Sequence, residues 1–180
     1  MSPLSKTGPY VVTVFALVPL FFWYPFASFT NLAASLISVG QATALVGTVL
    51  ICINFILSAR YLWVESLFAG LNRVFIIHAY VGAIGFILIL LHPTAILLGH
   101  VYISAQAVRD ILAPTIGNLP IYWGVATITT LTVLIILTLY VKMDYDLWKK
   151  THQYMGLVLL LAALHVLQIG STVAISTPLR

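Results

Sequence analysis

Five long apolar runs without a single Asp, Glu, Lys or Arg dominate this chain of 180 residues. Each run reaches the length of about 20 residues that an α-helix needs to cross the hydrocarbon core of a bilayer. Lipid offers no water to backbone N–H and C=O groups, so such runs must bond internally as helices. We therefore predict an all-α membrane protein, a five-span helical bundle. The spans run from about Tyr10 to Phe29, Leu32 to Leu57, Val74 to Leu98, Leu119 to Val141 and His152 to Ile175.

The composition excludes a water-soluble globular domain and predicts the lipid bilayer as a partner. Hydrophobic residues make up 62% of the chain and charged residues only 7%. A typical soluble domain has about a quarter of its residues charged. The net charge of +4 comes without a basic cluster, so no nucleic acid is expected as a partner. Cys52 is the single cysteine, which excludes an internal disulfide and a cysteine metal site within one chain.

Short connections join the five runs, so we expect residues 1–180 to form one domain. The longest connection is Gly99–Asn118, and its Val101–Leu112 part could form a short helix at the membrane interface. The positive-inside rule places the N-terminus inside, because most basic residues then face the cytoplasm. The inner residues are Lys6, Arg60, Arg73, Lys142, Lys149 and Lys150, and the outer ones are Arg109 and Arg180. Aromatic residues support this orientation, with Trp63, Tyr140, Tyr145 and Trp148 at the inner interface.

Two of the spans contain a pair of histidines. His78 and His92 are 14 residues apart in the third span, and His152 and His165 are 13 residues apart in the fifth. At a helical rise of about 1.5 Å per residue, each pair covers about 20 Å. The N-in orientation puts His78 and His152 near the inner face and His92 and His165 near the outer face. We therefore expect His78 to pair with His152, and His92 with His165.

Histidines at matched depths on two helices suit the iron of a haem. Ionisable side chains are rare inside membranes unless they have a function. Neutral imidazole is an axial ligand of haem iron, and two such ligands saturate the metal, which then transfers electrons. Two haems stacked across the bilayer would form an electron path. A single zinc or copper site is disfavoured, because its ligands must converge within a few ångströms.

Other residues are candidates for surrounding these cofactors. Haem propionates need water or cations near an interface. Arg73, Lys149 and Arg109 are possible contacts, although a plain role in topology is the commoner explanation for such residues. Gly82, Gly85 and Gly156 either make room for a porphyrin or allow close helix packing. His100 is expected in a solvated outer loop.

Helix geometry leaves one question open. Fourteen residues return to within about 40° of the same helix face, but thirteen miss that face by about 140°. A straight fifth span would therefore not aim His152 and His165 along one line. Either the span is locally distorted, or the two haems are approached from different sides. Pro93 follows His92 directly and should loosen the third span, which either aims His92 or only bends the helix.

The chain resembles the ferric reductase-like transmembrane domain family, which includes NADPH oxidases and ferric-chelate reductases. The resemblance rests on the stretch WVESLFAGLNRVFIIH ending at His78, on the pair His92–Pro93, and on YDLWKKTHQYMGLVLLLAALH from Tyr145 to His165. It implies a six-span fold of which this chain lacks the last helix, with two b-type haems in bis-histidine ligation. It also implies electrons passing from a cytoplasmic FAD, reduced by NAD(P)H, to an outer acceptor such as ferric iron or oxygen.

The sequence ends at Arg180 without a Gly-rich dinucleotide fingerprint. We therefore expect the FAD and NAD(P)H modules on a separate protein or on a missing part, with a flavin reductase as the cytoplasmic partner. The chain by itself would not use NAD(P)H, so its standing as an enzyme is open. The expected location is the cytoplasmic membrane of a prokaryotic cell.

Two other functions fit part of the pattern. One is the haem-bearing membrane subunit of a periplasmic methionine-sulfoxide reductase system. That protein shares the Trp148-x-x-x-His152 spacing, but this chain has Asn72-Arg73 where a dibasic pair is expected. The other is a channel or structural bundle whose histidines are satisfied polar groups. The acidic residues all fall in connections, so no membrane-embedded carboxylate would relay protons: Glu65, Asp110, Asp144 and Asp146.

Overall fold

A computed structural model of the protein describes residues 7–113 and 117–176, with side chains up to residue 169. Five of its helices are long and apolar enough to cross a membrane, which confirms the predicted all-helical class and the number of spans. Lys6 and Arg180, which contributed to the predicted orientation, lie outside the described residues.

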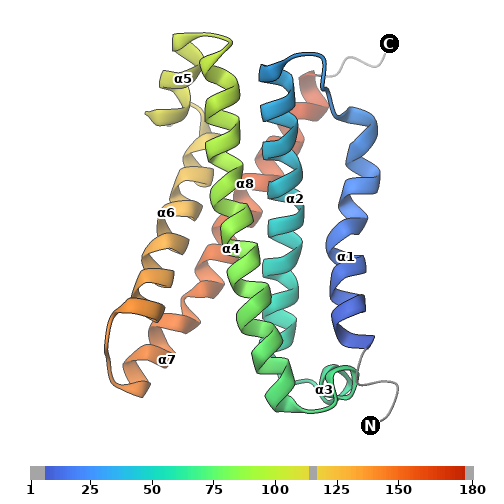
Figure 1. Ribbon diagram of the computed structural model, residues 1–180. Coiled ribbons are helices and arrows are strands. Elements are labelled where there is room, and N and C mark those ends of the chain that lie inside the picture. The colour runs from blue at the N-terminus through green and yellow to red at the C-terminus, as the bar shows by residue number, and fades with distance from the viewer. Residues whose placement is uncertain (1–6, 114–116, 177–180) are drawn as a thin grey trace. The chain divides into compact units, whose positions relative to one another are not determined.

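The helices follow one another closely along the chain (Figure 1). They are α1 (Thr7–Trp23), the 3-10 turn η2 (Tyr24–Phe26), α2 (Leu32–Ser58), α3 (Leu62–Phe68), α4 (Leu71–Val101), α5 (Ala105–Leu112), α6 (Leu119–Tyr140), α7 (Tyr145–Gln153) and α8 (Met155–Ser176). The candidate spans are α1 with η2, α2, α4, α6, and α7 with α8. The short helix expected within Val101–Leu112 is α5, whereas α3 and α7 were not predicted.

The internal contacts divide the chain into two compact units, Met1–Ala105 and Gln106–Arg180. That these units form the single haem-binding domain expected from the sequence stays a prediction.

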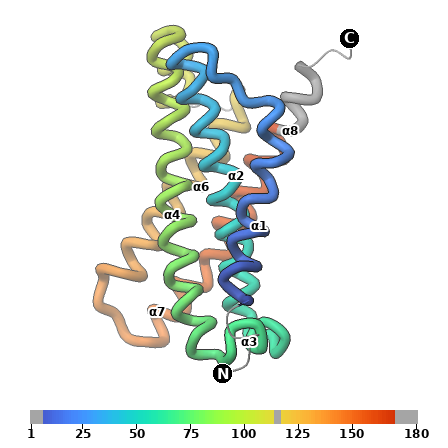
Figure 2. The backbone as a smooth tube through the Cα atoms, turned by 45° about the vertical axis from the view of Figure 1, so that its right-hand side comes forward, coloured from blue at the N-terminus to red at the C-terminus, as the bar shows by residue number. Residues whose placement is uncertain are grey.

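The first unit is built on the long antiparallel pair of α2 and α4. α1 packs along α2, and α3 lies across one end, where it contacts both α1 and α4 (Figures 1 and 2). Small residues let the two long helices approach. A Cβ atom on Gly47 would lie 3.0 Å from the Ile89 side chain, and one on Gly85 would lie 3.1 Å from Ile51. The tight pairing therefore depends on backbone-to-side-chain contacts that a larger residue would block.

The turn between α3 and α4 determines where the histidine-bearing helix begins. Gly70 has φ +125°, a conformation that side-chain-bearing residues rarely adopt. The Glu65 carboxylate accepts a hydrogen bond of 3.2 Å from the backbone N–H of Leu71, the first residue of α4. This bond satisfies one of the free N–H groups at a helix start and places negative charge at the positive end of the helix dipole.

The second unit contains the packed pair α6 and α8, with α7 at one end. A single residue, Tyr154, separates α7 from α8. Its N–H bonds back to the carbonyls of Thr151 and His152, and its own carbonyl accepts from Leu157 at 2.9 Å. The fifth span is therefore broken two residues after His152. Of the two explanations left open by the 13-residue spacing, the structure shows the local distortion.

Candidate functional site

His78 and His92 of the first unit lie on α4, and both bond to the backbone of α2. The Nδ1 atom of His78 is 3.2 Å from the carbonyl oxygen of Asn54, and that of His92 is 2.9 Å from the carbonyl oxygen of Gly40. A carbonyl oxygen only accepts hydrogen bonds, so each Nδ1 carries the proton. Nε2 of each neutral ring then keeps its lone pair, which is the form that binds a metal.

Glycines make these two contacts possible. A Cβ atom on Gly40 would lie 2.9 Å from Ile96 and 3.1 Å from the carbonyl oxygen of His92. A Cβ atom on Gly82 would lie 2.8 Å from the Asn54 amide nitrogen. Gly82 and Gly85 thus serve close packing of α4 against α2, which is one of the two roles considered for them. At Gly156 a Cβ atom would meet nothing within 4 Å.

In the second unit, His165 on α8 is held by α6 in the same manner. Its Nδ1 atom lies 2.7 Å from the carbonyl oxygen of Pro120, in the first turn of α6. The imidazole lies over Gly124, where a Cβ atom would be 2.8 Å from Cε1 of the ring. The same reasoning therefore assigns the proton to Nδ1 and the lone pair to Nε2, the form of the ring that binds a metal.

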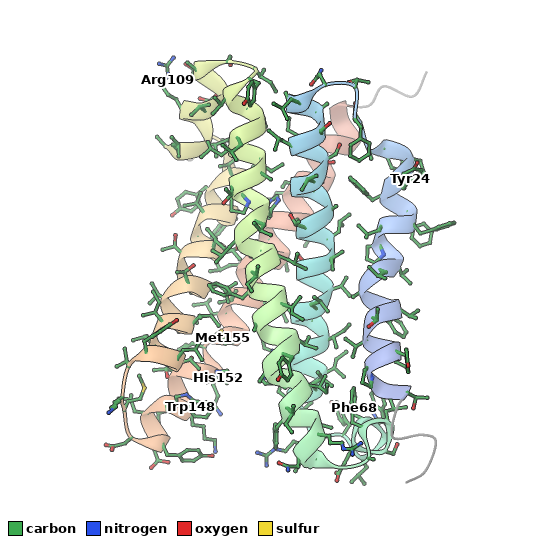
Figure 3. All side chains as sticks on the ribbon, in the orientation of Figure 1. Tyr24, Phe68, Arg109, Trp148, His152 and Met155 are labelled. Carbon is green, nitrogen blue, oxygen red and sulfur yellow. The ribbon has the colours of Figure 1, made fainter. Side chains whose placement is uncertain are left out.

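His152 lies on α7, and its ring stacks on the indole of Trp148 (Figure 3). The ring centroids are 5.2 Å apart and the planes differ by 7°. Trp148 in turn stacks on Tyr145 at 6.1 Å and 24°, and its indole N–H donates to the carbonyl oxygen of Thr138 at 3.3 Å. The rings of Tyr145, Trp148 and His152 are therefore stacked in one row, from the start of α7 to the histidine.

The separation of His78 and His92 along the helix axis follows directly from α4, which continues as a helix through Pro93. The 14 residues from His78 to His92 correspond to a separation of about 21 Å along the axis. Arg73 lies in the first turn of α4, at the His78 end. The Arg60 guanidinium sits 5.3 Å from the centroid of the Phe75 ring. Cationic side chains therefore gather at the end of the unit that holds His78.

Cations also mark the His152 end of the second unit, where Lys149 and Lys150 lie on α7. Arg109 lies on α5 and donates to the side-chain oxygen of Gln106 at 3.0 Å. Contacts of Arg73, Lys149 and Arg109 with propionates stay predictions. His100 lies in the last turn of α4, where its Nδ1 contacts the carbonyl oxygen of Ile96 at 2.8 Å, and not in a loop as expected.

Comparison with known proteins identifies the chain. The family model of the ferric reductase like transmembrane component matches residues 43–163, well over half of the chain. The protein belongs to this family. No curated protein and no solved structure matches the chain. Members of the family typically bind haem, and membership implies transmembrane electron transfer. His78, His92 and His152 fall within the matched part of this ferric reductase-like protein, and His165 follows two residues after it.

The donors found in this ferric reductase-like protein fit haem. Iron in a haem already has four porphyrin nitrogens and needs one axial atom from each side. His78, His92 and His165 each direct Nδ1 to a backbone carbonyl, so that Nε2 is the ring nitrogen that would bind iron. Sequence reasoning identified these rings but missed the carbonyls of Gly40, Asn54 and Pro120. Backbone groups have no signature in the sequence, although the seven-residue spacing of Gly40 and Gly47 could have pointed to the packed face of α2.

Proposed function

We propose that this protein carries electrons across a membrane through two b-type haems. His78 and His152 would be the axial ligands of an inner haem, and His92 and His165 those of an outer haem. The N-terminus would lie in the cytoplasm, so that His78 and His152 are on the side of the donor. The observation that carries the proposal is the shared Nδ1–carbonyl contact, which prepares three intramembrane histidines as ligands.

The carbonyl contacts have two effects on the ligands. They select the tautomer with the proton on Nδ1, and they hold the ring against rotation about its Cβ–Cγ bond. The hydrogen bond also makes Nε2 more basic, which strengthens it as a ligand. Haem bound in this way supplies one-electron chemistry, with iron cycling between two oxidation states.

Apolar residues of the spans provide the surroundings that such a carrier needs. α4 and α6 contain no Asp, Glu or Lys, and the one Arg of α4 lies in its first turn. Such spans would keep water from the histidines that lie within them, so that electrons cross where ions do not. The basic residues at the His78 and His152 ends would contact propionates and attract an acidic donor surface. We propose a cytoplasmic flavin protein as donor and a small outer acceptor, such as ferric iron or oxygen.

A reduced-minus-oxidised optical spectrum of the purified protein, with haem quantitation, tests the proposal. We expect low-spin b-type haem at about two per chain. A colourless protein after expression with sufficient haem supply would refute it.

The pairing is tested by single and double substitutions. His92→Ala and His165→Ala should each remove one haem, and the double variant should lose no more than either single variant. His78→Ala and His152→Ala should remove the other haem in the same non-additive way. His100→Ala is the control and should keep both haems. Loss of different haems in His92→Ala and His165→Ala would contradict the assigned pairs.

A further inference from the structure

The rings of Tyr145, Trp148 and His152 form one continuous stack along α7. Figure 3 labels Trp148 and His152 on this helix. The residues are three and four positions apart, the spacings that bring side chains together on one face of a helix. The interplanar angle falls from 24° between Tyr145 and Trp148 to 7° between Trp148 and His152. A centroid distance of 5.2 Å with nearly parallel planes is an offset stack, a favourable geometry for aromatic pairs.

Trp148 is itself fixed from two directions. Its indole N–H donates to the carbonyl oxygen of Thr138 at 3.3 Å, which ties α7 to the last turn of α6. Its backbone carbonyl accepts a bond of 2.8 Å from the Thr151 hydroxyl, next to His152. The indole therefore connects the histidine ring to a long helix of the same unit.

His152 needs such a contact with Trp148 because the helix is broken at Tyr154. His92 and His78 share the unbroken α4, so the helix itself relates their directions. His152 lies before the break and His165 after it, so α8 does not determine the direction of the His152 ring. A ring stack constrains the plane of an imidazole, because rotation of the ring would break the nearly parallel contact with the indole.

From this geometry we infer that Trp148 is a positioning residue that sets the plane of the His152 imidazole at the inner haem. The inference rests on the proposed function and assigns a role in it to a residue that does not touch iron. In a haem with two axial histidines, the angle between the imidazole planes affects the electron paramagnetic resonance signal of the ferric iron. Groups around a ligand also tune the reduction potential of the metal. Trp148 should therefore influence one haem of the two.

The experiment compares three variants of the full chain in purified form. Trp148→Leu removes the stacking partner and the N–H donor, while Trp148→Phe keeps a smaller aromatic ring and loses the donor. Trp63→Leu is the control, because Trp63 also stacks on a tyrosine, Tyr61, at 6.2 Å and 16° but lies on α3, on a different helix and in the other compact unit. The readouts are the electron paramagnetic resonance spectrum, a redox titration and the haem content.

We expect Trp148→Leu to change the resonance signal and the potential of the haem that His152→Ala removes. It should also weaken the binding of that haem by about tenfold, as loss of a group that orients a ligand does. Trp148→Phe should shift the same signal by less, and Trp63→Leu should leave both signals unchanged. If Trp148→Leu does not yield folded protein, Trp148→Phe alone must shift that one signal.

Two outcomes overturn the inference. One is a Trp148→Leu or Trp148→Phe protein whose two haem signals and potentials equal those of the unmodified chain. The other is an equal shift of both haems, which would indicate a general loosening of the fold. The proposed function fails separately, when the unmodified chain shows no bis-histidine haem.

Discussion

The two units hold their histidines by different structural means. In the first unit, His78 and His92 lie on the continuous helix α4 and donate to carbonyls of its neighbour α2. In the second unit, the span is broken at Tyr154, with His152 stacked on Trp148 before the break and His165 bonded to Pro120 after it. The comparison shows that a 14-residue spacing works on an unbroken helix, whereas a 13-residue spacing goes together with a separate short helix.

The largest effect is expected from changing the spacing itself. Insertion of one alanine after Tyr154 would give the second unit a 14-residue spacing and rotate His165 by about 100° relative to His152. Because the break already supplies the required change of direction, we expect the variant to lose one of its haems, as measured by haem quantitation. If the inserted chain keeps both haems with unchanged spectra, the break is incidental and the two units are equivalent.

Gly124 offers the next test, because it lies under the His165 ring. A Cβ atom there would be 2.8 Å from Cε1, so Gly124→Val should displace the imidazole and release the haem that depends on His165. Forcing atoms into such a packed position also destabilises the fold by about 1–3 kcal/mol. Haem quantitation and a thermal melt measure the two effects. Val125→Leu, at the exposed neighbouring position, is the control and should change neither.

A smaller effect is expected from a substitution of Glu65, which caps the start of α4. Glu65→Ala removes the acceptor that caps the Leu71 N–H, and losing such a cap costs about 1 kcal/mol. The melting temperature of the variant should fall while both haems remain, since the carbonyl contacts of His78 and His92 lie further along the helix. Loss of a haem in this variant would show that the α3–α4 turn positions His78 directly. Glu65→Gln, which keeps an oxygen acceptor, should restore most of the stability.

The smallest effect is expected from a substitution at Asn54. This substitution tests whether His78 depends on the backbone carbonyl of Asn54 or on its side chain. The Asn54 side-chain oxygen is buried and finds no hydrogen-bond partner among the described residues, while its backbone carbonyl accepts from His78. Asn54→Leu keeps the carbonyl and removes the unsatisfied oxygen. We expect both haems to remain and the melting temperature to stay equal or rise slightly. A selective loss of the His78 haem would instead assign a direct role to the amide.

The sequence predicts most of the fold. Of the site, it predicts the histidines but not the backbone groups that hold them. Span number follows from uncharged apolar runs, which only helices can satisfy in lipid. α3 and α7 were missed because segments such as Tyr145–Gln153 are polar enough to resemble connections. The histidines could be recognised because imidazole is unusual in a span. The carbonyl of Pro120 could not be recognised, because which backbone oxygen meets His165 depends on the register of α6 against α8. Pairing of histidines between the units stays a prediction.

The backbone contacts of His78, His92 and His165 have an evolutionary consequence. Every residue type provides a carbonyl, so no point mutation at position 54 or 120 deletes the group that selects the histidine tautomer. Natural variants can thus exchange those side chains freely, provided that the helices keep their alignment and the glycines stay small. Conservation in relatives should accordingly concentrate on the histidines and on the glycines at positions 40 and 124, while the side chains at positions 54 and 120 vary. The Trp148 contact differs, because it depends on the side chain at one position. A point mutation at that position can therefore remove the contact.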